Sequence, residues 1–298
     1  MLTKQEFSVL AEYEKNSNLA PKEVAGKIKM SFNDFKNTTS DLTEKGYIIG
    51  SQITDEGLNV LEPYRVKRAI FIAAGMGTRM MPITINTPKP LVRVNGVRII
   101  DTLIDACIAA GIEEIIVVRG YLGEIFDQLK YKYPNITFVD NPYYKTYNNI
   151  SSAYLVRDKI ANAYVFESDI YLVNQDLISK YQYESNYLGV PVKSTPDWCF
   201  DTDENLKITD LHKGGKNCHH MYGIAYYNEE MGNLFAEKVG DVFDNMLGGK
   251  DHFWDDVLCH FYVDLSDIYV RECTFQDTME IDSFEELCEI DEHYRMRT

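Results

Sequence analysis

From about residue 66 onward, short apolar segments alternate with longer amphipathic ones, and this alternation constrains the fold more than any other feature. The apolar segments have the length of strands and lie at residues 69–73, 114–118, 136–139, 163–166 and 187–190. An amphipathic helix is expected at residues 99–110, between the first two. Strands that alternate with helices form a mostly parallel sheet with flanking helices. Beyond Pro191 the alternation loosens, and segments 222–227 and 268–273 are expected to extend this sheet into a mixed one. We therefore expect an α/β domain over residues 66–298.

Residues 1–64 follow another pattern, with three or four short helices, a small hairpin and the start of a further helix. Ser31 is expected to cap the third helix. This order resembles a winged helix-turn-helix of the kind found in bacterial regulators. Acidic residues of the segment roughly equal or exceed its Lys and Arg, and the whole chain carries a formal charge of −16, so nucleic-acid binding is not favoured. An interaction or packing module and a DNA-binding module remain as alternatives.

The chain shows no apolar run that approaches the roughly 20 residues needed to span a bilayer, and its first residues lack the apolar core of a signal peptide. We expect a cytoplasmic protein without membrane partners. The six cysteines are scattered without a Cys-x-x-Cys pair, which favours reduced thiols over disulfides. His212, Cys218, His219 and His220 lack the four-ligand spacing of structural zinc.

A glycine-containing loop directly follows the first expected strand, with Gly75 and Gly77 separated by one residue. Glycines allow a tight turn and bring backbone N–H groups close to phosphate oxygens. Thr78 adds a hydroxyl donor, while Arg79 and Lys89 supply the positive charge that a triphosphate and its transition state require. The loop lacks the third glycine of a Rossmann fingerprint and the Gly-Lys-Ser/Thr of a Walker loop.

The longer string at residues 73–91 contains Gly-x-Gly-Thr-Arg, then Pro-x-Thr, then Pro-Lys-Pro-Leu. It resembles the signature of nucleotidyltransferases that activate sugar phosphates and amino-alcohol phosphates, enzymes of the nucleotide-diphospho-sugar transferase fold. The resemblance implies that residues 75–79 wrap the triphosphate and that Lys89 bridges nucleotide and acceptor phosphates. It further implies nucleotide contacts at Ala74, Gly75, Gly77, Thr78, Gly120, Tyr121, Asn148 and Ser152.

Two acidic motifs are candidates for a metal site. Glu167-Ser168-Asp169 ends an apolar strand, where open α/β sheets place functional groups. Mg²⁺ takes one or two carboxylates together with phosphates and water, which suits Asp169. The family has a second metal-binding aspartate late in the chain. Asp282 resembles it, because Asp282 also follows an acidic and an apolar residue. Asp282 also precedes an expected helix, so a role as helix N-cap is an alternative or additional assignment.

The acceptor is suggested by a second resemblance. The chain has no Glu-Lys-Pro motif of the sugar-phosphate branch, and residues 67–287 resemble bacterial phosphocholine cytidylyltransferases of the LicC type. Matching segments are Tyr147 to Ser152, Pro196-Asp197-Trp198, Tyr222-Gly223-Ile224 and Phe253-Trp254-Asp255. A quaternary ammonium is recognised by aromatic faces and a nearby carboxylate. We therefore expect a choline cage of Trp198, Tyr222 and Trp254, with Asp255 as counter-charge.

These motifs predict transfer of CMP from CTP to phosphocholine, giving CDP-choline and pyrophosphate, with Mg²⁺ as cofactor. Other acceptors are left open: phosphoethanolamine, an aminoalkylphosphonate or a sugar 1-phosphate. A transcriptional regulator whose transferase-like domain senses a metabolite is the alternative outside enzymes. The expected partners are CTP and the phosphorylated acceptor, and an oligomer is compatible with the sequence.

Overall fold

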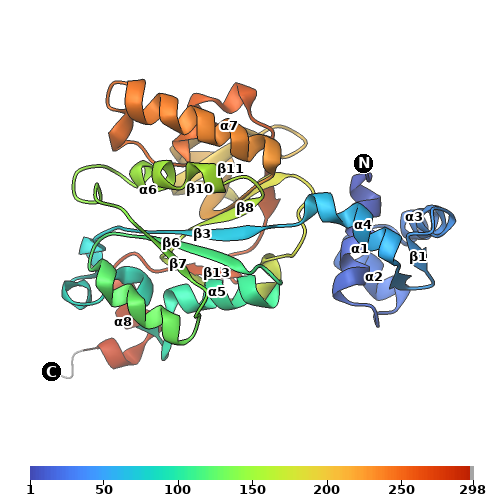
Figure 1. The fold of residues 1–298 in the computed structure, drawn as a ribbon, viewed down its shortest axis with the longest axis horizontal. Helices are drawn as coiled ribbons and strands as arrows, with labels where there is room; N and C mark the ends of the chain where they lie inside the picture. The colour runs from blue at the N-terminus through green and yellow to red at the C-terminus, as the bar shows by residue number, and fades with distance from the viewer. Residues whose placement is uncertain (296–298) are drawn as a thin grey trace. The chain divides into compact units, whose positions relative to one another are not determined.

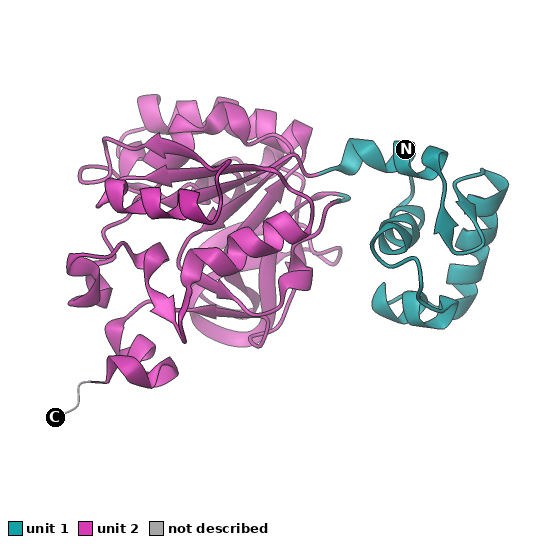
Figure 2. Ribbon diagram, turned by 60° about the horizontal axis from the view of Figure 1, so that its bottom comes forward, with its two compact units in different colours: residues 1–65, 181–183 teal, residues 66–180, 184–298 magenta. Residues whose placement is uncertain are grey.

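A computed structural model of the chain describes residues 1–295 and divides them into two compact units (Figure 2). The first unit comprises residues 1–65 together with 181–183. The second comprises residues 66–180 and the chain from Glu184 onward. The short segment 181–183 was expected within the second domain, yet Tyr181 and Tyr183 pack into the apolar core of the first unit.

The first unit consists of helices and one small hairpin. Its elements are α1 (Lys4–Lys15), α2 (Pro21–Lys27), α3 (Phe32–Glu44), β1 (Ile48–Ile49), β2 (Gln52–Ile53), α4 (Asp55–Leu61) and the 3₁₀ turn η1 (Glu62–Tyr64). Ser31 caps α3 by accepting a hydrogen bond from the backbone N–H of Asp34, as its position in the sequence predicted. Leu10, Phe35 and Leu42 lie at the centre of the core. The likeness to a winged helix-turn-helix remains a prediction.

The second unit is built on a seven-stranded mixed sheet, with strand order β12-β10-β11-β8-β3-β6-β7 (Figure 1). The strands are β3 (Arg68–Ala73), β6 (Glu114–Arg119), β7 (Thr137–Asp140), β8 (Ala163–Glu167), β10 (Ser185–Thr202), β11 (Ile208–Tyr227) and β12 (Ile268–Glu272). Strands β8, β3, β6 and β7 are parallel, whereas β11 is antiparallel to both β8 and β10. The predicted α/β fold with a mostly parallel mixed sheet is thus confirmed.

Helices cover both faces of this sheet, with α6 and α7 on one side and α5 on the other (Figure 1). The helices are α5 (Ile99–Ala109), α6 (Ile150–Leu155), α7 (Glu229–Gly240) and α8 (Phe284–Ile290). Single turns are η2 (Thr78–Met80), η3 (Ile83–Ile85), η4 (Lys89–Leu91), η6 (Arg157–Lys159), η7 (Gln175–Leu177), η9 (Gly249–Asp251), η11 (Val263–Leu265) and η12 (Glu292–Tyr294), with longer segments η5 (Gly123–Tyr131), η8 (Asp241–Asn245) and η10 (Val257–Phe261). Within residues 1–295, the helices are all too short or too polar to cross a membrane.

Strand β3 shows why the first apolar segment is continuous rather than alternating. Ala69 and Phe71 point into one hydrophobic core, and Ile70 and Ile72 into the other. Since successive side chains of a strand face opposite sides, a strand covered on both faces must be apolar throughout. The loop that follows β3 therefore emerges from a fully buried strand.

Two small ladders complete the second unit: β4 (Arg93–Val94) with β5 (Val97–Arg98), and β9 (Ile170–Leu172) with β13 (Thr278–Glu280). In the second ladder Glu280 pairs with Ile170. This antiparallel pairing brings the segment just after β13 beside the segment just before β9, although they lie more than 100 residues apart in the chain.

Candidate active site

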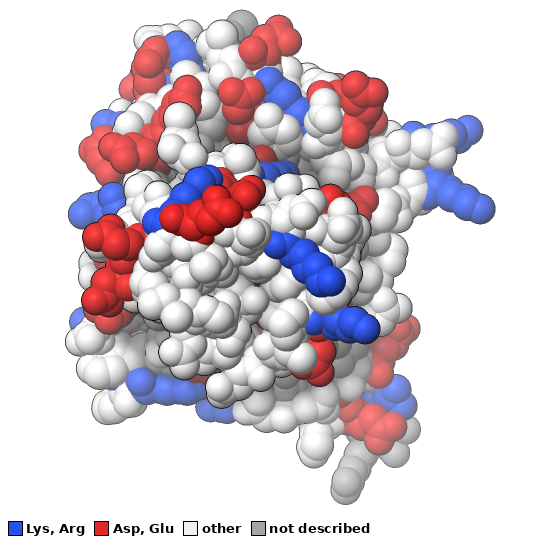
Figure 3. All heavy atoms as spheres, turned by 90° about the vertical axis from the view of Figure 1, so that its right-hand side faces the viewer, with Lys and Arg blue, Asp and Glu red and all other residues white. Residues whose placement is uncertain are grey.

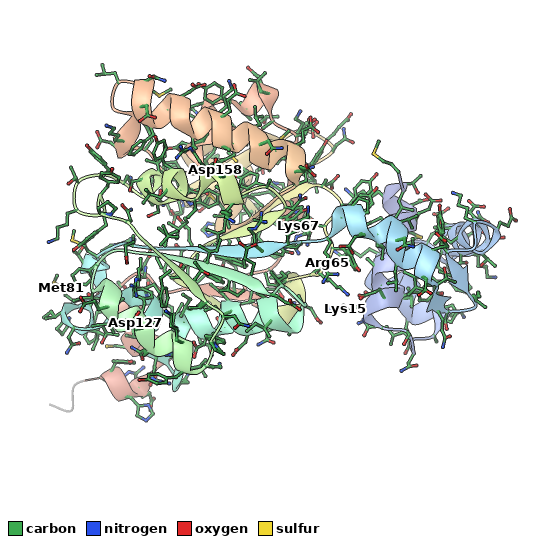
Figure 4. All side chains as sticks on the ribbon, in the orientation of Figure 1. Lys15, Arg65, Lys67, Met81, Asp127 and Asp158 are labelled. Carbon is green, nitrogen blue, oxygen red and sulfur yellow. The ribbon has the colours of Figure 1, made fainter. Side chains whose placement is uncertain are left out.

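The loop after β3 folds around its second glycine. Gly77 has a φ of +59°, and a β-carbon there would lie 3.0 Å from Cβ of Lys89, so conformation and close packing both favour glycine. Thr84 donates a hydrogen bond to the carbonyl of Gly77 (2.8 Å). A β-carbon at Gly75 would meet nothing within 4 Å, which leaves this part of the loop open. Met81, labelled in Figure 4, follows the η2 turn with half of its surface exposed.

Gly120 and Tyr121 support this loop rather than face the space in front of it. The backbone N–H of Tyr121 donates to the carbonyl of Ala74 (3.1 Å), and its hydroxyl donates to the carbonyl of Thr84 (2.8 Å). At Gly120 a β-carbon would lie 2.7 Å from the ring of Tyr144. These contacts hold Gly120 and Tyr121 against the loop and Tyr144, and the nucleotide contacts expected of the two residues remain a prediction.

A cavity of about 310 Å³ opens in front of the loop, and we call it the first cavity. Ten of the residues selected from the sequence line it: Ala74, Gly75, Gly77, Thr78, Arg79, Lys89, Asn148, Ser152, Asp169 and Asp282. Its lining also includes Asn141 and Tyr144, which the sequence did not single out, and Tyr147, Asn149 and Ser168, which lie in matching motifs but were given no role. Asn141 donates to the hydroxyls of Ser151 (3.0 Å) and Ser152 (2.9 Å), so a buried amide orients the serines at the start of α6.

Two cations and two carboxylates meet at the floor of the first cavity. Lys89 Nζ lies 2.9 Å from Oδ2 of Asp169 and 2.9 Å from Oδ1 of Asp282, and Arg79 lies 2.9 Å from Oδ2 of Asp282. Burial alone would lower the pKa of Lys89, but the two carboxylates outweigh it and the pKa is raised. Burial opposes ionisation of Asp282, yet Lys89 and Arg79 lower its pKa. These pKa shifts favour the charged forms of both Lys89 and Asp282.

Within residues 1–295, Asp169, Glu280 and Asp282 form a group of carboxylates that could hold a metal ion, with one oxygen of each within 4.8 Å of the others. Oδ1 of Asp169 is buried without a hydrogen-bond partner, and carboxylate oxygens are the ligands that hard divalent ions prefer. Glu280 was not selected from the sequence. Its pKa is raised to about 8 by burial and by the charges of Asp169 and Asp282.

The helix-cap alternative for Asp282 is settled by α8. Ser283 is the N-cap, and its hydroxyl accepts a hydrogen bond from the backbone N–H of Glu286. The carboxylate of Glu286 in turn accepts from the backbone N–H of Ser283. The backbone N–H of Asp282 also donates to Glu286 (2.7 Å). The side chain of Asp282 thus remains directed at Lys89 and Arg79.

A second cavity of about 430 Å³ adjoins the first. Carboxylates dominate its lining: Glu167, Asp169, Asp197, Asp255, Asp256, Glu280 and Asp282. Two aromatic rings, Trp198 and Phe253, face it as a T-shaped pair with centroids 5.5 Å apart. Arg79 and Lys213 are the cations in its lining. Acidic side chains thus outnumber basic ones in this lining by seven to two.

The structure changes two walls of the expected aromatic cage. Trp254 is completely buried and stacks on Tyr187 with ring centroids 5.7 Å apart. Tyr222 is also buried, because it shares one face of β11 with Ile224 and both belong to the same core. Neither ring reaches the lining of the second cavity, and Phe253, the neighbour of Trp254, does so instead.

The second cavity is lined by a buried carboxyl group, Asp255, and a half-buried one, Glu167. Asp255 accepts a hydrogen bond from the hydroxyl of Tyr187 (2.9 Å), and burial nevertheless raises its pKa to about 8. Glu167, the last residue of β8, accepts from the side-chain amide of Asn149 (3.3 Å). Burial, together with the charges of Asp255 and Asp169, raises the pKa of Glu167 well above its usual range.

The sheet, the glycine loop at the end of β3 and the charged floor define an α/β enzyme that binds a phosphorylated nucleotide. Residues 68–187 match the profile of the nucleotidyl transferase family. The chain is 37% identical over 229 residues to a 2-aminoethylphosphonate cytidylyltransferase of Lancefieldella rimae, covering 76% of this chain and 92% of the relative. It belongs to this family and is a nucleotidyltransferase.

Other relatives agree in fold and in sequence. A choline-phosphate cytidylyltransferase of Streptococcus pneumoniae is 34% identical over 229 residues, covering 76% of this chain and 97% of that protein. The solved structure of the CTP:phosphocholine cytidylyltransferase from Streptococcus pneumoniae superposes with a TM-score of 0.70 at 32% identity, covering 78% of this chain and all of the other.

Proposed function

We propose that the enzyme transfers CMP from CTP to a small acceptor with a phosphonate or phosphate at one end and a primary ammonium group at the other. The observation that carries this proposal is the lining of the second cavity, in which seven carboxylates accompany only two aromatic rings. A primary ammonium donates three hydrogen bonds to such oxygens, whereas a quaternary ammonium donates none and depends on aromatic faces. Acceptors of the 2-aminoethylphosphonate or phosphoethanolamine type are therefore favoured over phosphocholine.

The choice of CTP rests on the relatives, since both named above are cytidylyltransferases. In this proposal the triphosphate occupies the first cavity, against the loop from Gly75 to Arg79. The acceptor occupies the second cavity. The two cavities share Arg79, Asn149, Glu167, Asp169 and Asp282, so the reacting phosphorus would lie at this junction.

The chemistry follows from ionised groups already present. An oxygen of the acceptor's phosphonate or phosphate attacks the α-phosphorus of CTP, a new P–O bond forms, and the bond to the β-phosphate breaks to release pyrophosphate. The acceptor oxygen is already ionised at neutral pH, so no protein base or covalent intermediate is required. Lys89 and Arg79 would neutralise the charge that develops on the transferred group, which is catalysis by positioning and electrostatics.

The acidic group supports a further part of the proposal, that Asp169 and Asp282 hold Mg²⁺ with Glu280 close by. The unpartnered Oδ1 of Asp169 and the mutual distances of the three carboxylates fit such an ion. When bound, Mg²⁺ supplies charge neutralisation for the phosphates. Without it, Lys89 balances the two aspartates, which keeps this strongly acidic site together.

Phosphocholine is the second candidate acceptor, because Trp198 and Phe253 offer two aromatic faces to a cation. A sugar 1-phosphate carries no positive charge and would leave the carboxylates of the second cavity without a partner. A metabolite sensor without catalysis would not need Lys89 held between two aspartates at the junction.

The proposal is tested by pyrophosphate release over a matrix of four NTPs and four acceptors with Mg²⁺. The acceptors are 2-aminoethylphosphonate, phosphoethanolamine, phosphocholine and glucose 1-phosphate. We expect the highest kcat/KM with CTP and one of the two primary amines. A higher value for phosphocholine would select the second candidate, and failure of every acceptor would refute transfer to this class of compound.

A further inference from the structure

We propose that Glu167 is a specificity-determining residue that recognises the positive charge of the acceptor, and that Gly223 and Asn149 are positioning residues that hold its carboxyl group. This inference rests on the function proposed above and assigns charge recognition to a side chain at the junction of the two cavities.

The position of Glu167 follows from the strand order. β8 separates β3, which carries the glycine loop, from β11, which borders the second cavity. Glu167 is the last residue of β8, and its carboxyl group leans toward β11: a β-carbon at Gly223 would lie 2.5 Å from Cγ and 2.7 Å from Cδ of Glu167. Any side chain at Gly223 would displace this carboxyl group. Glycine at position 223 therefore leaves the space that the carboxyl group of Glu167 occupies.

Asn149 fixes the carboxyl group from the other direction. The side-chain Nδ2 of Asn149 donates to Oε1 of Glu167, and the side-chain Oδ1 of Asn149 accepts from the backbone N–H of Trp254 (3.0 Å). The chain neighbours of Trp254, Phe253 and Asp255, both line the second cavity. A single amide thus links Glu167 to the wall of the acceptor site.

Four of the six other carboxylates in the lining of the second cavity pair with groups that the acceptor does not supply. Asp169 and Asp282 pair with Lys89. Asp255 accepts from Tyr187. Oδ2 of Asp256 accepts from the backbone N–H of Phe253 (3.0 Å).

By contrast, Asn149 is the one side chain among residues 1–295 that hydrogen-bonds Glu167, and it does so through Oε1 at 3.3 Å. Glu167 also lines both cavities, and an acceptor that attacks the α-phosphorus must lie at their junction. Glu167 is therefore well placed to meet an ammonium group two carbons from the reacting phosphonate.

The test compares a charged acceptor with a neutral one of the same size, 2-aminoethylphosphonate against 2-hydroxyethylphosphonate, using the full chain with CTP and Mg²⁺. Glu167→Gln keeps the shape and the acceptor atom for Asn149 but removes the charge. We expect kcat/KM for the amine to fall about ten- to a hundredfold, the range of a hydrogen bond to a charged group, with little change for the hydroxyl compound. The KM for CTP should stay within about twofold.

Gly223→Ala keeps every charge but displaces the carboxyl group, and it should reduce the same amine-to-hydroxyl ratio. Glu272→Gln, on β12 and outside the lining of both cavities, is the matched control and should leave the ratio unchanged. A ratio in Glu167→Gln equal to that of the parent, or a rise confined to the KM for CTP, would overturn the inference. Equal losses for both acceptors would show a merely structural role. If the parent transfers CMP to no phosphorus acceptor, the proposed function itself fails.

Discussion

Lys89 Nζ lies 2.9 Å from Oδ2 of Asp169, and this ion pair joins the glycine-loop motif to the first acidic motif. The two residues are 80 positions apart in the chain. Their contact places a fixed positive charge beside the carboxylates proposed to hold Mg²⁺. The substrates and the ion would therefore bind into a site that is already balanced in charge.

Lys89→Met should separate the catalytic role of this cation from its structural one. We expect kcat/KM to fall about a hundred- to a thousandfold, the loss typical of an electrostatic group acting in a transition state. Without Lys89, Asp169 and Asp282 repel each other, so the melting temperature in EDTA should drop and recover when Mg²⁺ is added. Melting curves with and without Mg²⁺ check this, and a variant of normal activity would remove Lys89 from the mechanism.

Asp169→Asn and Asp282→Asn should each abolish turnover that depends on Mg²⁺, because each removes a charged ligand while keeping its shape. The fold should persist, since both side chains are partly exposed at the cavity. Initial rates as a function of Mg²⁺ concentration provide the measurement. Near-parental rates in Asp169→Asn at moderate Mg²⁺ would disprove the metal assignment.

Asp255 should make the stability of the substrate-free protein depend on pH. Burial raises its pKa from an ordinary value of 3.8 to about 8, so the folded protein binds a proton that the unfolded chain has released. Stability from this group is complete below pH 3.8 and declines as pH rises toward 8. Asp255→Asn cannot ionise, so its melting temperature relative to the parent should rise between pH 4 and pH 8 and then level off.

Glu204→Gln, at an exposed position, is the control, because it also removes one negative charge from the protein. A constant difference in melting temperature between Asp255→Asn and the parent across this pH range would show that Asp255 is ionised in the folded protein throughout.

The three aromatic residues near the second cavity should separate into two groups. Trp198→Ala and Phe253→Ala remove cavity walls, and acceptor kcat/KM should fall about five- to thirtyfold with CTP binding unchanged. Trp254→Ala instead empties a completely buried site, and the free energy of unfolding should fall by about 3–5 kcal/mol. Parallel CTP and acceptor titrations with melting curves distinguish the two outcomes. If Trp254→Ala instead loses acceptor use selectively while its stability stays normal, Trp254 belongs to the acceptor site as the sequence predicted.

The first unit is predicted to be dispensable for catalysis and to bind DNA weakly. Residues 1–65 contain ten acidic and eight basic residues. On the face shown in Figure 3, Lys and Arg side chains of the described residues are scattered among Asp and Glu. Removal of residues 1–64 should leave kcat/KM within about threefold but expose Tyr183, whose ring stacks on Tyr64 at 5.6 Å. Tight, salt-sensitive binding of the full chain to a duplex, measured by fluorescence anisotropy, would contradict the weak-binding prediction.

The sequence by itself determined the features that depend on contiguous residues. A strand buried on both faces needs an unbroken apolar run, as in β3, and a phosphate loop needs small residues and cations at fixed short spacing. For this reason the alternation of strands and helices, the loop from Gly75 to Arg79 and the strand-end position of Asp169 were predicted from local patterns.

Tertiary structure decided which further side chains join this site and which way each one faces. Only the pairing of β9 with β13 brings Glu280 and Asp282 to Asp169, because that pairing joins segments far apart in the chain. The sequence pointed to residues 253–255 but chose Trp254, although Phe253 is the ring that lines the second cavity. Adjacent residues point in different directions, and the direction each takes depends on the distant elements that pack against it. Tyr187 and Phe235, both remote in sequence, bury the larger ring.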